Sequence, residues 1–213
     1  MNVSAALEAM RAESVPEGWS GLWLVKKLEI SGPTLSERHG KPVLVQPGVY
    51  TFLHRLTDGT LHHEPPGVTV MEDTRCELVT HLDFVLRARG KVLVTGLGLG
   101  CVVRGLLANP AVEHVTCIEN SPDVLRLVGP YMPKERLTII QADALEWTAL
   151  NTEKFDCAWH DLWTDRAAGE PLLDFWHVRL IMNCRRTVKQ QGAWGFDRLL
   201  RRRLGKYGIQ WIG

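Results

Sequence analysis

The chain has 213 residues, of which 45% are hydrophobic and 23% are charged, and its net charge is +1. This composition is typical of a globular protein with one cored domain and a smaller appendage. The nearly neutral charge argues against an overall role in binding polyanions, and no apolar run approaches the roughly 18 residues that cross a bilayer. The N-terminus lacks a basic start followed by an apolar block, so we expect a cytoplasmic enzyme or binding protein.

The first part of the chain, residues 1–70, is expected to form a small N-terminal unit. A helical pattern covers residues 5–11, and the stretch GWSGLWLVKKLEI, residues 18–30, is compatible with helix or strand. From Pro42 to about Met71 the alternation of apolar and polar residues, with a turn at Asp58-Gly59, predicts an antiparallel unit. We therefore expect a helix followed by antiparallel β structure.

The second part, residues 71–213, alternates between strand and helix patterns. Expected helices cover residues 73–89, 101–108, 122–128, 144–150, 171–189 and 197–208, and expected strands cover 91–96, 112–119, 136–143, 155–161 and 191–196. Such alternation predicts an α/β fold with a Rossmann-like, doubly wound and mainly parallel sheet. Only about 17 residues follow the fifth strand, so we expect the sheet to be truncated at its C-terminal end.

The expected strand ends carry polar or glycine residues, and ligands bind at this edge of a parallel sheet. Gly96, Gly98 and Gly100 follow the first parallel strand, and Glu119 ends the second, 23 residues after Gly96. A carboxylate at that place is suited to accept hydrogen bonds from both hydroxyls of a ribose. Without a ligand, the glycines would form only a tight turn and Glu119 would be a solvated acid.

The third and fourth strands also end in acids, Asp143 and Asp161. Asp143 is placed to accept from an adenine amino group or to cap the helix that follows, and the two roles are compatible. A dinucleotide fingerprint, G-x-G-x-x-G, requires glycine where Cys101 stands. The spacing G-x-G-x-G therefore argues against NAD.

These features resemble the class I S-adenosylmethionine-dependent methyltransferases, and most closely the spermidine synthase branch, the polyamine aminopropyltransferases. The stretches CELVTHLDF, VLVTGLGLG, VEHVTCIENSPDVLRLV and FDCAWHDLWTD carry the resemblance. It implies a site that binds S-adenosylmethionine or its decarboxylated form. In that site Glu119 would bind the ribose, Asp143 and Ala144 would lie on the adenine side, and Asp161 would face the reacting sulfonium. Asn120, also a candidate for cofactor binding, stands where the branch usually has an apolar residue that packs on adenine.

The chain departs from this branch after the catalytic acid. The branch has a second acid in a run similar to Asp-Ser-Ser/Thr-Asp-Pro, whereas here the run is DLWTD, with Trp163 in the middle, Asp165 one place late and no proline. We therefore expect a methyltransferase-like enzyme that acts on a small acceptor. The alternatives are a polyamine aminopropyltransferase and a non-catalytic protein that binds an adenosyl nucleoside.

Other polar clusters admit simpler interpretations. Adjacent histidines in a strand point to opposite faces, so His62 and His63 do not predict a metal site. Glu77 and His81, four apart on a helix, are expected to form a polar pair. Strand alternation directs His160 away from Asp161. The three tryptophans near this strand end are expected to line a pocket or to pack in the core: Trp159, Trp163 and Trp176.

Cysteine usage and the basic C-terminal end complete the expectations. The five cysteines include no C-x-x-C pair and are expected to be reduced core thiols. Residues 184–213 contain eight basic side chains against one acidic side chain. A solvated helix face explains this balance, while a site for RNA phosphates or an acidic partner is the alternative. The sequence leaves a homo-oligomer open.

Overall fold

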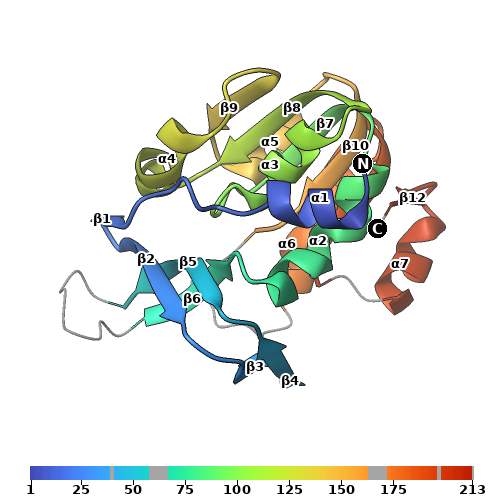
Figure 1. Cartoon of the computed structure of the whole chain (residues 1–213). Helices are drawn as coiled ribbons and strands as arrows, with labels where there is room; N and C mark the ends of the chain where they lie inside the picture. The colour runs from blue at the N-terminus through green and yellow to red at the C-terminus, as the bar shows by residue number, and fades with distance from the viewer. Residues whose placement is uncertain (39–40, 58–66, 163–171, 196–197, 213) are drawn as a thin grey trace.

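The computed structural model describes residues 1–38, 41–57, 67–162, 172–195 and 198–212, and its main strands form two sheets (Figure 1). The smaller sheet is antiparallel and has the strand order β1-β2-β5-β6, with β3 and β4 forming a separate hairpin. The helix and strands of this N-terminal part of the chain are α1 (Val3–Ala9), β1 (Gly18–Ser20), β2 (Trp23–Ile30), β3 (Thr34–Arg38), β4 (Lys41–Val45), β5 (Gly48–Leu56) and β6 (Gly67–Glu72). The undecided stretch of residues 18–30 is thus a pair of strands.

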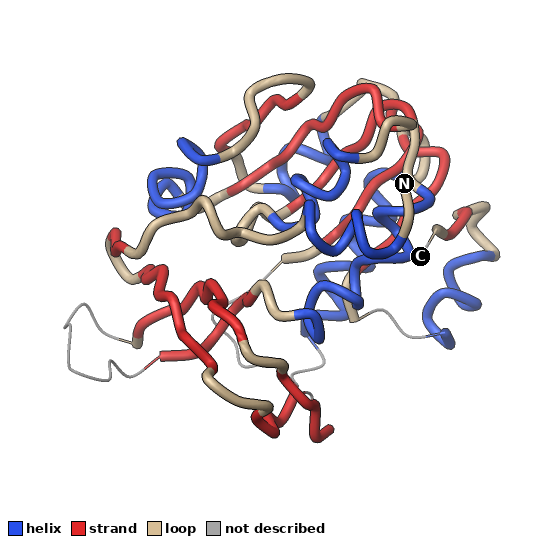
Figure 2. The backbone as a smooth tube through the Cα atoms, viewed as in Figure 1, coloured by secondary structure: helices blue, strands red, loops and turns tan. Residues whose placement is uncertain are grey.

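The larger sheet is parallel throughout and has the order β12-β11-β10-β7-β8-β9. Figure 2 shows the strands of the chain in red and the helices in blue. Its strands are β7 (Gly90–Thr95), β8 (Val112–Glu119), β9 (Leu137–Gln141), β10 (Phe155–His160), β11 (Val188–Ala193) and β12 (Gln210–Trp211). The chain runs outward from β7 to β9 and then returns to place β10 on the other side of β7. The carboxyl ends of β7 and β10 therefore flank the point where the strand order reverses, which is where open α/β sheets bind ligands.

Helices cover both faces of this sheet, as predicted. They are α2 (Arg75–Arg87), α3 (Cys101–Ala108), α4 (Pro122–Val128), α5 (Ala144–Leu150), α6 (Leu172–Cys184) and α7 (Arg198–Gly205), with a 3-10 turn at Gly129–Tyr131. Val92 and Val94 of β7 pack in the core with α1, α2 and α3, whereas Leu93 packs with α5 and α6. Because both faces of β7 are buried, its sequence is a continuous apolar run.

Two helices begin at caps that are visible in the sequence. The Ser121 hydroxyl accepts a hydrogen bond from the amide of Val124 at 3.2 Å, and Pro122 occupies the first turn of α4. Asp143 caps α5 in the same way. Such side chains satisfy amide groups that have no partner within the helix, and they fix where it starts. These caps place Glu119 and Asp143 directly before helix N-termini.

The C-terminal third differs from the sequence-based expectation. The helix expected over residues 171–189 ends at Cys184, β11 begins at Val188, and β12 adds a sixth strand that the sequence did not predict. The expected fifth strand is present, but it covers Val188–Ala193 and not residues 191–196, because its polar start did not look like strand. Gln191 is buried there with hydrogen-bond partners. Its amide oxygen lies 3.0 Å from Nε2 of His160, and its amide nitrogen donates to the carbonyl of Ile181 at 3.2 Å.

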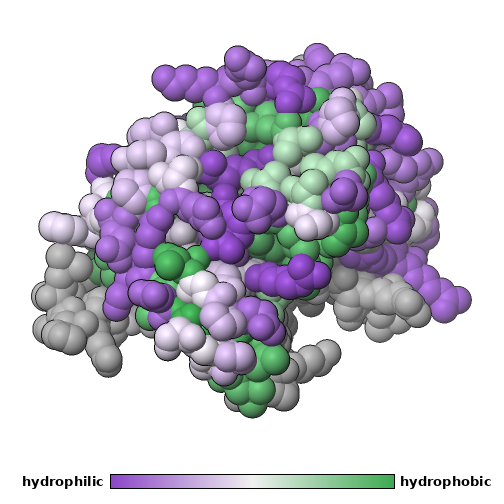
Figure 3. All heavy atoms as spheres, viewed as in Figure 1, coloured by the Kyte–Doolittle hydropathy of each residue, from purple (hydrophilic) through white to green (hydrophobic). Residues whose placement is uncertain are grey.

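The surface in Figure 3 is largely polar, and hydrophobic side chains gather at its lower end over the β3–β4 hairpin. Leu35 and Leu44 of this hairpin are 71% and 52% exposed. Among the helices of the described residues, none combines the length and the apolar character that a membrane crossing requires. Several expectations fall outside the described residues, namely the turn at Asp58-Gly59, the cluster His62, His63 and Glu64, and the pair Trp163 and Asp165.

Candidate functional site

A cavity of about 1070 Å³ opens at the carboxyl edge of the parallel sheet. The ends of β7, β8, β9 and β10 all contribute to it, as the strand-end argument predicted. Seven of the eight predicted site residues line this cavity: Gly96, Gly98, Glu119, Asn120, Asp143, Ala144 and Asp161. Gly100 is not among the described residues that line the cavity. It is the N-cap residue of α3.

The three glycines of the loop allow close packing that any side chain would block. All have positive φ values, 94° at Gly96, 52° at Gly98 and 78° at Gly100. A Cβ atom on Gly96 would collide with the backbone carbonyl oxygen of Asp161, and one on Gly100 would collide with the thioether of Met132. Gly96 therefore lets the ends of β7 and β10 approach each other, so the loop itself positions Asp161.

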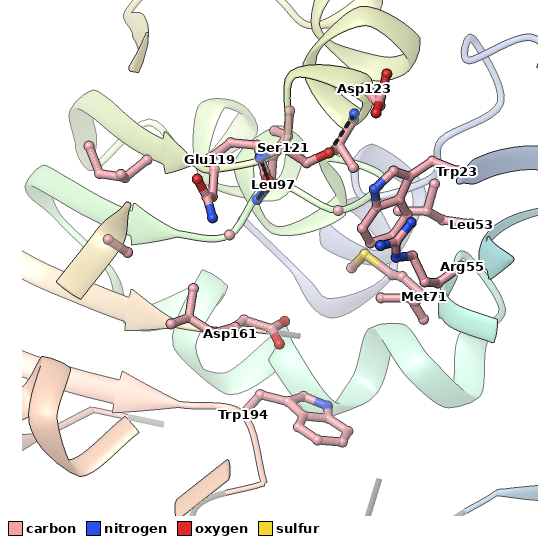
Figure 4. A pocket seen from close by; sticks show the side chains of 18 of the residues that line it. Trp23, Leu53, Arg55, Met71, Leu97, Glu119, Ser121, Asp123, Asp161 and Trp194 are labelled. Atoms are coloured by element: carbon pink, nitrogen blue, oxygen red, sulfur yellow. Dashed lines mark hydrogen bonds between the residues drawn. The ribbon is translucent and has the colours of Figure 1, made fainter. Parts of the chain in front are cut away.

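Glu119 connects the glycine loop to the start of α4. One carboxylate oxygen accepts from the amide of Leu97 at 2.8 Å, and the other accepts from the amide of Ser121 at 2.8 Å (Figure 4). Burial raises the pKa of Glu119 above its ordinary value, and the hydrogen bonds from these amides oppose that rise. The backbone amides of Asn120 and Gly98 lower the pKa of Glu119 in the same way, so the loop surrounds this carboxylate with donors.

Asp143 serves as a helix cap at the rim of the cavity. Its Oδ1 accepts from the amides of Leu145 at 2.8 Å and Glu146 at 3.0 Å. The capping role that the sequence offered is therefore confirmed. The adenine-binding role remains a prediction, and it would fall to Oδ2.

The N-terminal sheet supplies the facing wall of the cavity. Figure 4 shows Trp23, Leu53, Arg55 and Met71 together on one side, opposite Asp161 and Trp194. The Arg55 guanidinium lies over the Trp23 ring, 5.4 Å from its centroid. Met71 reaches the glycine loop, where its sulfur accepts from the amide of Leu99 at 3.3 Å. Sequence reasoning did not single out these residues, because their placement depends on how two distant sheets pack together.

Asp161 follows β10 and is only 27% exposed. Its amide donates to the carbonyl of Thr95 at 3.0 Å, which continues the pairing of β10 with β7. Burial raises the pKa of its carboxyl group to about 6, with His81 lowering it and Glu77 raising it. A carboxylate with this pKa at a cavity wall is suited to exchange a proton near neutral pH.

Glu77 and His81 form the pair expected on α2, with Nε2 of His81 3.6 Å from Oε1 of Glu77. The helical spacing did not predict that His81 would also lie close to Asp161. Its Nδ1 lies 3.9 Å from Oδ2 of Asp161, and Glu77 itself lines the cavity.

His160 points away from Asp161, as strand alternation predicted. Its ring is fully buried, with Nδ1 3.1 Å from the Thr95 hydroxyl and Nε2 3.0 Å from Gln191. On α6, Nε2 of the buried His177 accepts from the amide of Leu162 at 3.3 Å. Burial lowers the pKa of each histidine to about 4. Both rings therefore support the strand end as neutral hydrogen-bonding groups.

We expect His160 to make the protein less stable in acid. The unfolded chain binds a proton at this histidine below about pH 6.5, whereas the native chain binds it only near pH 4. Between pH 7 and 4.5 this difference removes about 2–3 kcal/mol from the free energy of unfolding. The free energy of unfolding of His160→Asn should fall correspondingly less between the two pH values. Urea titrations at both pH values measure this difference. An equal loss in variant and native protein would contradict this assignment.

Cys101, the first residue of α3, is expected to be unreactive in the native protein. Its side chain is fully buried, and burial raises the pKa of its thiol above the ordinary value. Cys76 is the only one of the five cysteines that is not buried. Alkylation followed by peptide mass spectrometry should therefore find Cys76 labelled first and Cys101 only in urea. Prompt labelling of Cys101 without denaturant would show that the loop opens.

Comparisons with known proteins agree with this architecture, although no family model matches the chain. The polyamine aminopropyltransferases of Sodalis glossinidius (strain morsitans) and Pseudomonas syringae pv. tomato are 25% and 26% identical over 125 residues. These alignments cover 54% of this chain and 42% and 43% of the relatives. The chain thus spans less than half the length of the curated relatives it matches.

Two solved structures have a similar fold. Spermidine synthase from Thermotoga maritima superposes with a TM-score of 0.52 at 17% identity, covering 90% of this chain and 62% of that protein. A spermidine synthase in complex with the transition state analogue AdoDATO gives a TM-score of 0.50 at 17% identity, covering 82% and 54%. The predicted resemblance is confirmed: the chain has the Rossmann-like fold of the spermidine synthases, and its sequence is similar to that of polyamine aminopropyltransferases.

Proposed function

We propose that the chain is an S-adenosylmethionine-dependent transferase that moves a methyl group to a small acceptor. One observation carries this proposal: a single cavity joins the glycine loop and Glu119 to Asp161. The spermidine synthase fold supports it, since one such enzyme was solved with AdoDATO. S-adenosylmethionine supplies a carbon bonded to a positively charged sulfur, which departs as a neutral thioether when the acceptor attacks.

The residues present fit an adenosyl group. Gly96 and Gly98 bring the backbone of the loop to the cavity, and the missing side chain of Gly98 lets the Met71 sulfur pack against this backbone. Glu119, which lines the cavity, would accept hydrogen bonds from the ribose hydroxyls. Asn120, Asp143 and Ala144 would contact the adenine. These roles follow from the strand-end positions and from the resemblance to the spermidine synthase branch.

The acceptor half of the cavity contains Asp161 and Glu77 together with large aromatic side chains. The described lining of the whole cavity includes four tryptophans: Trp23 on the N-terminal wall, and Trp159, Trp176 and Trp194. Asp161 would receive the proton that the acceptor loses, and the indole rings would exclude water and contact a flat or cationic acceptor. Aligning the acceptor with the reactive carbon is the main task that remains for the protein in such a displacement.

The charge of the opposite wall favours a cofactor that keeps its carboxylate. Arg55 is the one basic side chain among the cavity-lining residues that the structure describes. Leu53, two residues earlier on the same face of β5, pairs with Met71, which contacts the glycine loop. A guanidinium in this region complements the carboxylate of S-adenosylmethionine, which the decarboxylated form lacks.

Aminopropyl transfer to an amine is the second candidate. The similarity to polyamine aminopropyltransferases favours it, as do the two carboxylates, Glu77 and Asp161, at the acceptor end. The third possibility is an adenosyl-nucleoside-binding protein without turnover.

Product analysis separates these three functions. The purified chain is incubated either with methyl-labelled S-adenosylmethionine or with its decarboxylated form, each with a panel of small amine and aromatic acceptors. Methyl transfer predicts S-adenosylhomocysteine and a labelled acceptor. Methylthioadenosine with an aminopropylated amine would instead establish the second candidate. Nucleoside binding without any product across the panel would indicate the third.

A further inference from the structure

Three buried titratable side chains form a row that runs behind the cavity wall. His81 lies between two carboxylates, with Nε2 3.6 Å from Glu77 and Nδ1 3.9 Å from Asp161. The side chain of His81 is fully buried, while those of Glu77 and Asp161 are 8% and 27% exposed. Glu77 and Asp161 line the cavity, and the imidazole that joins them does not.

The surrounding side chains hold this imidazole in place. The His81 ring meets Trp159 edge to face at 5.5 Å with an interplanar angle of 82°, and Trp159 packs on Phe84 at 5.0 Å. The N-terminal end of α2 is anchored by the buried Asp73, which accepts from the amides of Ala12 at 2.9 Å and Thr51 at 2.7 Å. The row is therefore built on a helix and a strand end that are both fixed.

Stability does not explain why such a row is retained. Within the described residues neither ring nitrogen of His81 has a hydrogen-bond partner, and both are oriented toward carboxylates beyond hydrogen-bond distance. Burying several ionisable groups costs free energy because they lose their contacts with water. Packed apolar side chains of similar volume often make the fold equally stable or more stable. Charged groups kept at such a cost beside a cavity are typical of functional sites.

We propose that His81 is a positioning residue for Asp161: held between Glu77 and Asp161, its ring keeps the Asp161 carboxylate ionised and directed into the cavity. This inference rests on the proposed function for the use of that carboxylate, while the charge coupling itself belongs to the folded chain. A proton on the ring offsets the negative charge of Asp161, which Nδ1 faces. Glu77, at the other end of the row, faces Nε2 and opposes the effect of His81 on Asp161.

Three side chains act on the pKa of Asp161 besides burial. His81 lowers it and Glu77 raises it, both from α2, and the indole of Trp159 on β10 also lowers it. His177 of α6 instead bonds to the neighbouring amide of Leu162. His160 lies among Thr95 and Gln191. The effect of each member of the row can therefore be measured separately.

The test follows the titration of the Asp161 carboxyl carbon by NMR in protein labelled with ¹³C-aspartate, with Asp161→Asn providing the assignment. His81→Gln removes the imidazole that lowers the pKa of Asp161, so the midpoint of Asp161 should rise by about one pH unit or more. Glu77→Gln removes the opposing anion, so the midpoint should fall. His114→Gln, which removes a histidine of β8 outside the described cavity lining, should leave the midpoint unchanged.

Opposite shifts in the two α2 variants support the inference, and an unchanged midpoint in both overturns it. Glu77→Gln keeps the test decisive if His81→Gln fails to fold. Where turnover is present, the acid limb of kcat/KM should move with the NMR midpoint, a change that a purely structural role for His81 does not produce. Shifted midpoints without turnover on any acceptor would reject the proposed function and leave the coupling established.

Discussion

Replacing Asp161 by Asn is expected to lower turnover by about 100-fold or more, the usual contribution of a positioned acid–base group. The carboxylate would take the proton of the acceptor, and an amide of the same shape cannot. Because the pKa of Asp161 is raised to about 6, turnover of the native protein should fall as the pH drops below 6. Initial rates and cofactor titrations on both proteins measure the two effects.

The same substitution should stabilise the fold, which distinguishes a lost function from a damaged structure. The native chain holds the Asp161 proton up to about pH 6 and the unfolded chain only up to about 3.8, so ionisation of the native state costs free energy at neutral pH. Asp161→Asn should therefore raise the free energy of unfolding by about 1–3 kcal/mol at pH 7.5 and by less at pH 4.5. Full turnover in a folded variant would eliminate Asp161 from the mechanism.

Glu119→Ala should weaken binding of S-adenosylmethionine by about 10- to 100-fold, since charge-assisted hydrogen bonds contribute roughly 1.5–3 kcal/mol. Part of this loss is expected to be indirect, because Glu119 also accepts from the amides of Leu97 and Ser121. Isothermal titration calorimetry measures the change. Glu119→Gln keeps one accepting oxygen, so its affinity for S-adenosylmethionine should lie between those of Glu119→Ala and the native protein.

Glu113 offers a matched control, because it lies on β8 as Glu119 does but is exposed to solvent. Glu113→Ala should bind the nucleoside as the native protein does. Equal affinities in all of these variants would remove Glu119 from the binding site and would leave it only a role in holding the loop.

The sequence predicted the central part of the fold because its signals are local. The helices α3, α4 and α5 and the strand β8 have the predicted bounds, since apolar runs stop at recognisable caps such as Ser121 and Asp143. Prediction failed where tertiary contacts outweigh local pattern. The fifth strand was predicted over residues 191–196, but β11 begins at Val188, because the polar side chain of Gln191 is satisfied in the core by His160 and Ile181.

The candidate site follows the same division. The strand-end argument found Glu119 and Asp161 because parallel strands deliver their carboxyl ends to one edge. It missed the contact between His81 and Asp161, which are 80 positions apart, and the wall that Trp23 and Arg55 supply from another sheet. Such contacts depend on how helices and sheets pack, and no short motif records them.

Calorimetric titration of the purified chain with S-adenosylmethionine, its decarboxylated form and NAD tests the central claim most directly. The account predicts saturable binding of S-adenosylmethionine at one site per chain, weaker binding of the decarboxylated form because it lacks the carboxylate that Arg55 complements, and no binding of NAD. Binding of NAD in preference to both sulfonium nucleosides, or no binding of any of the three, would contradict it.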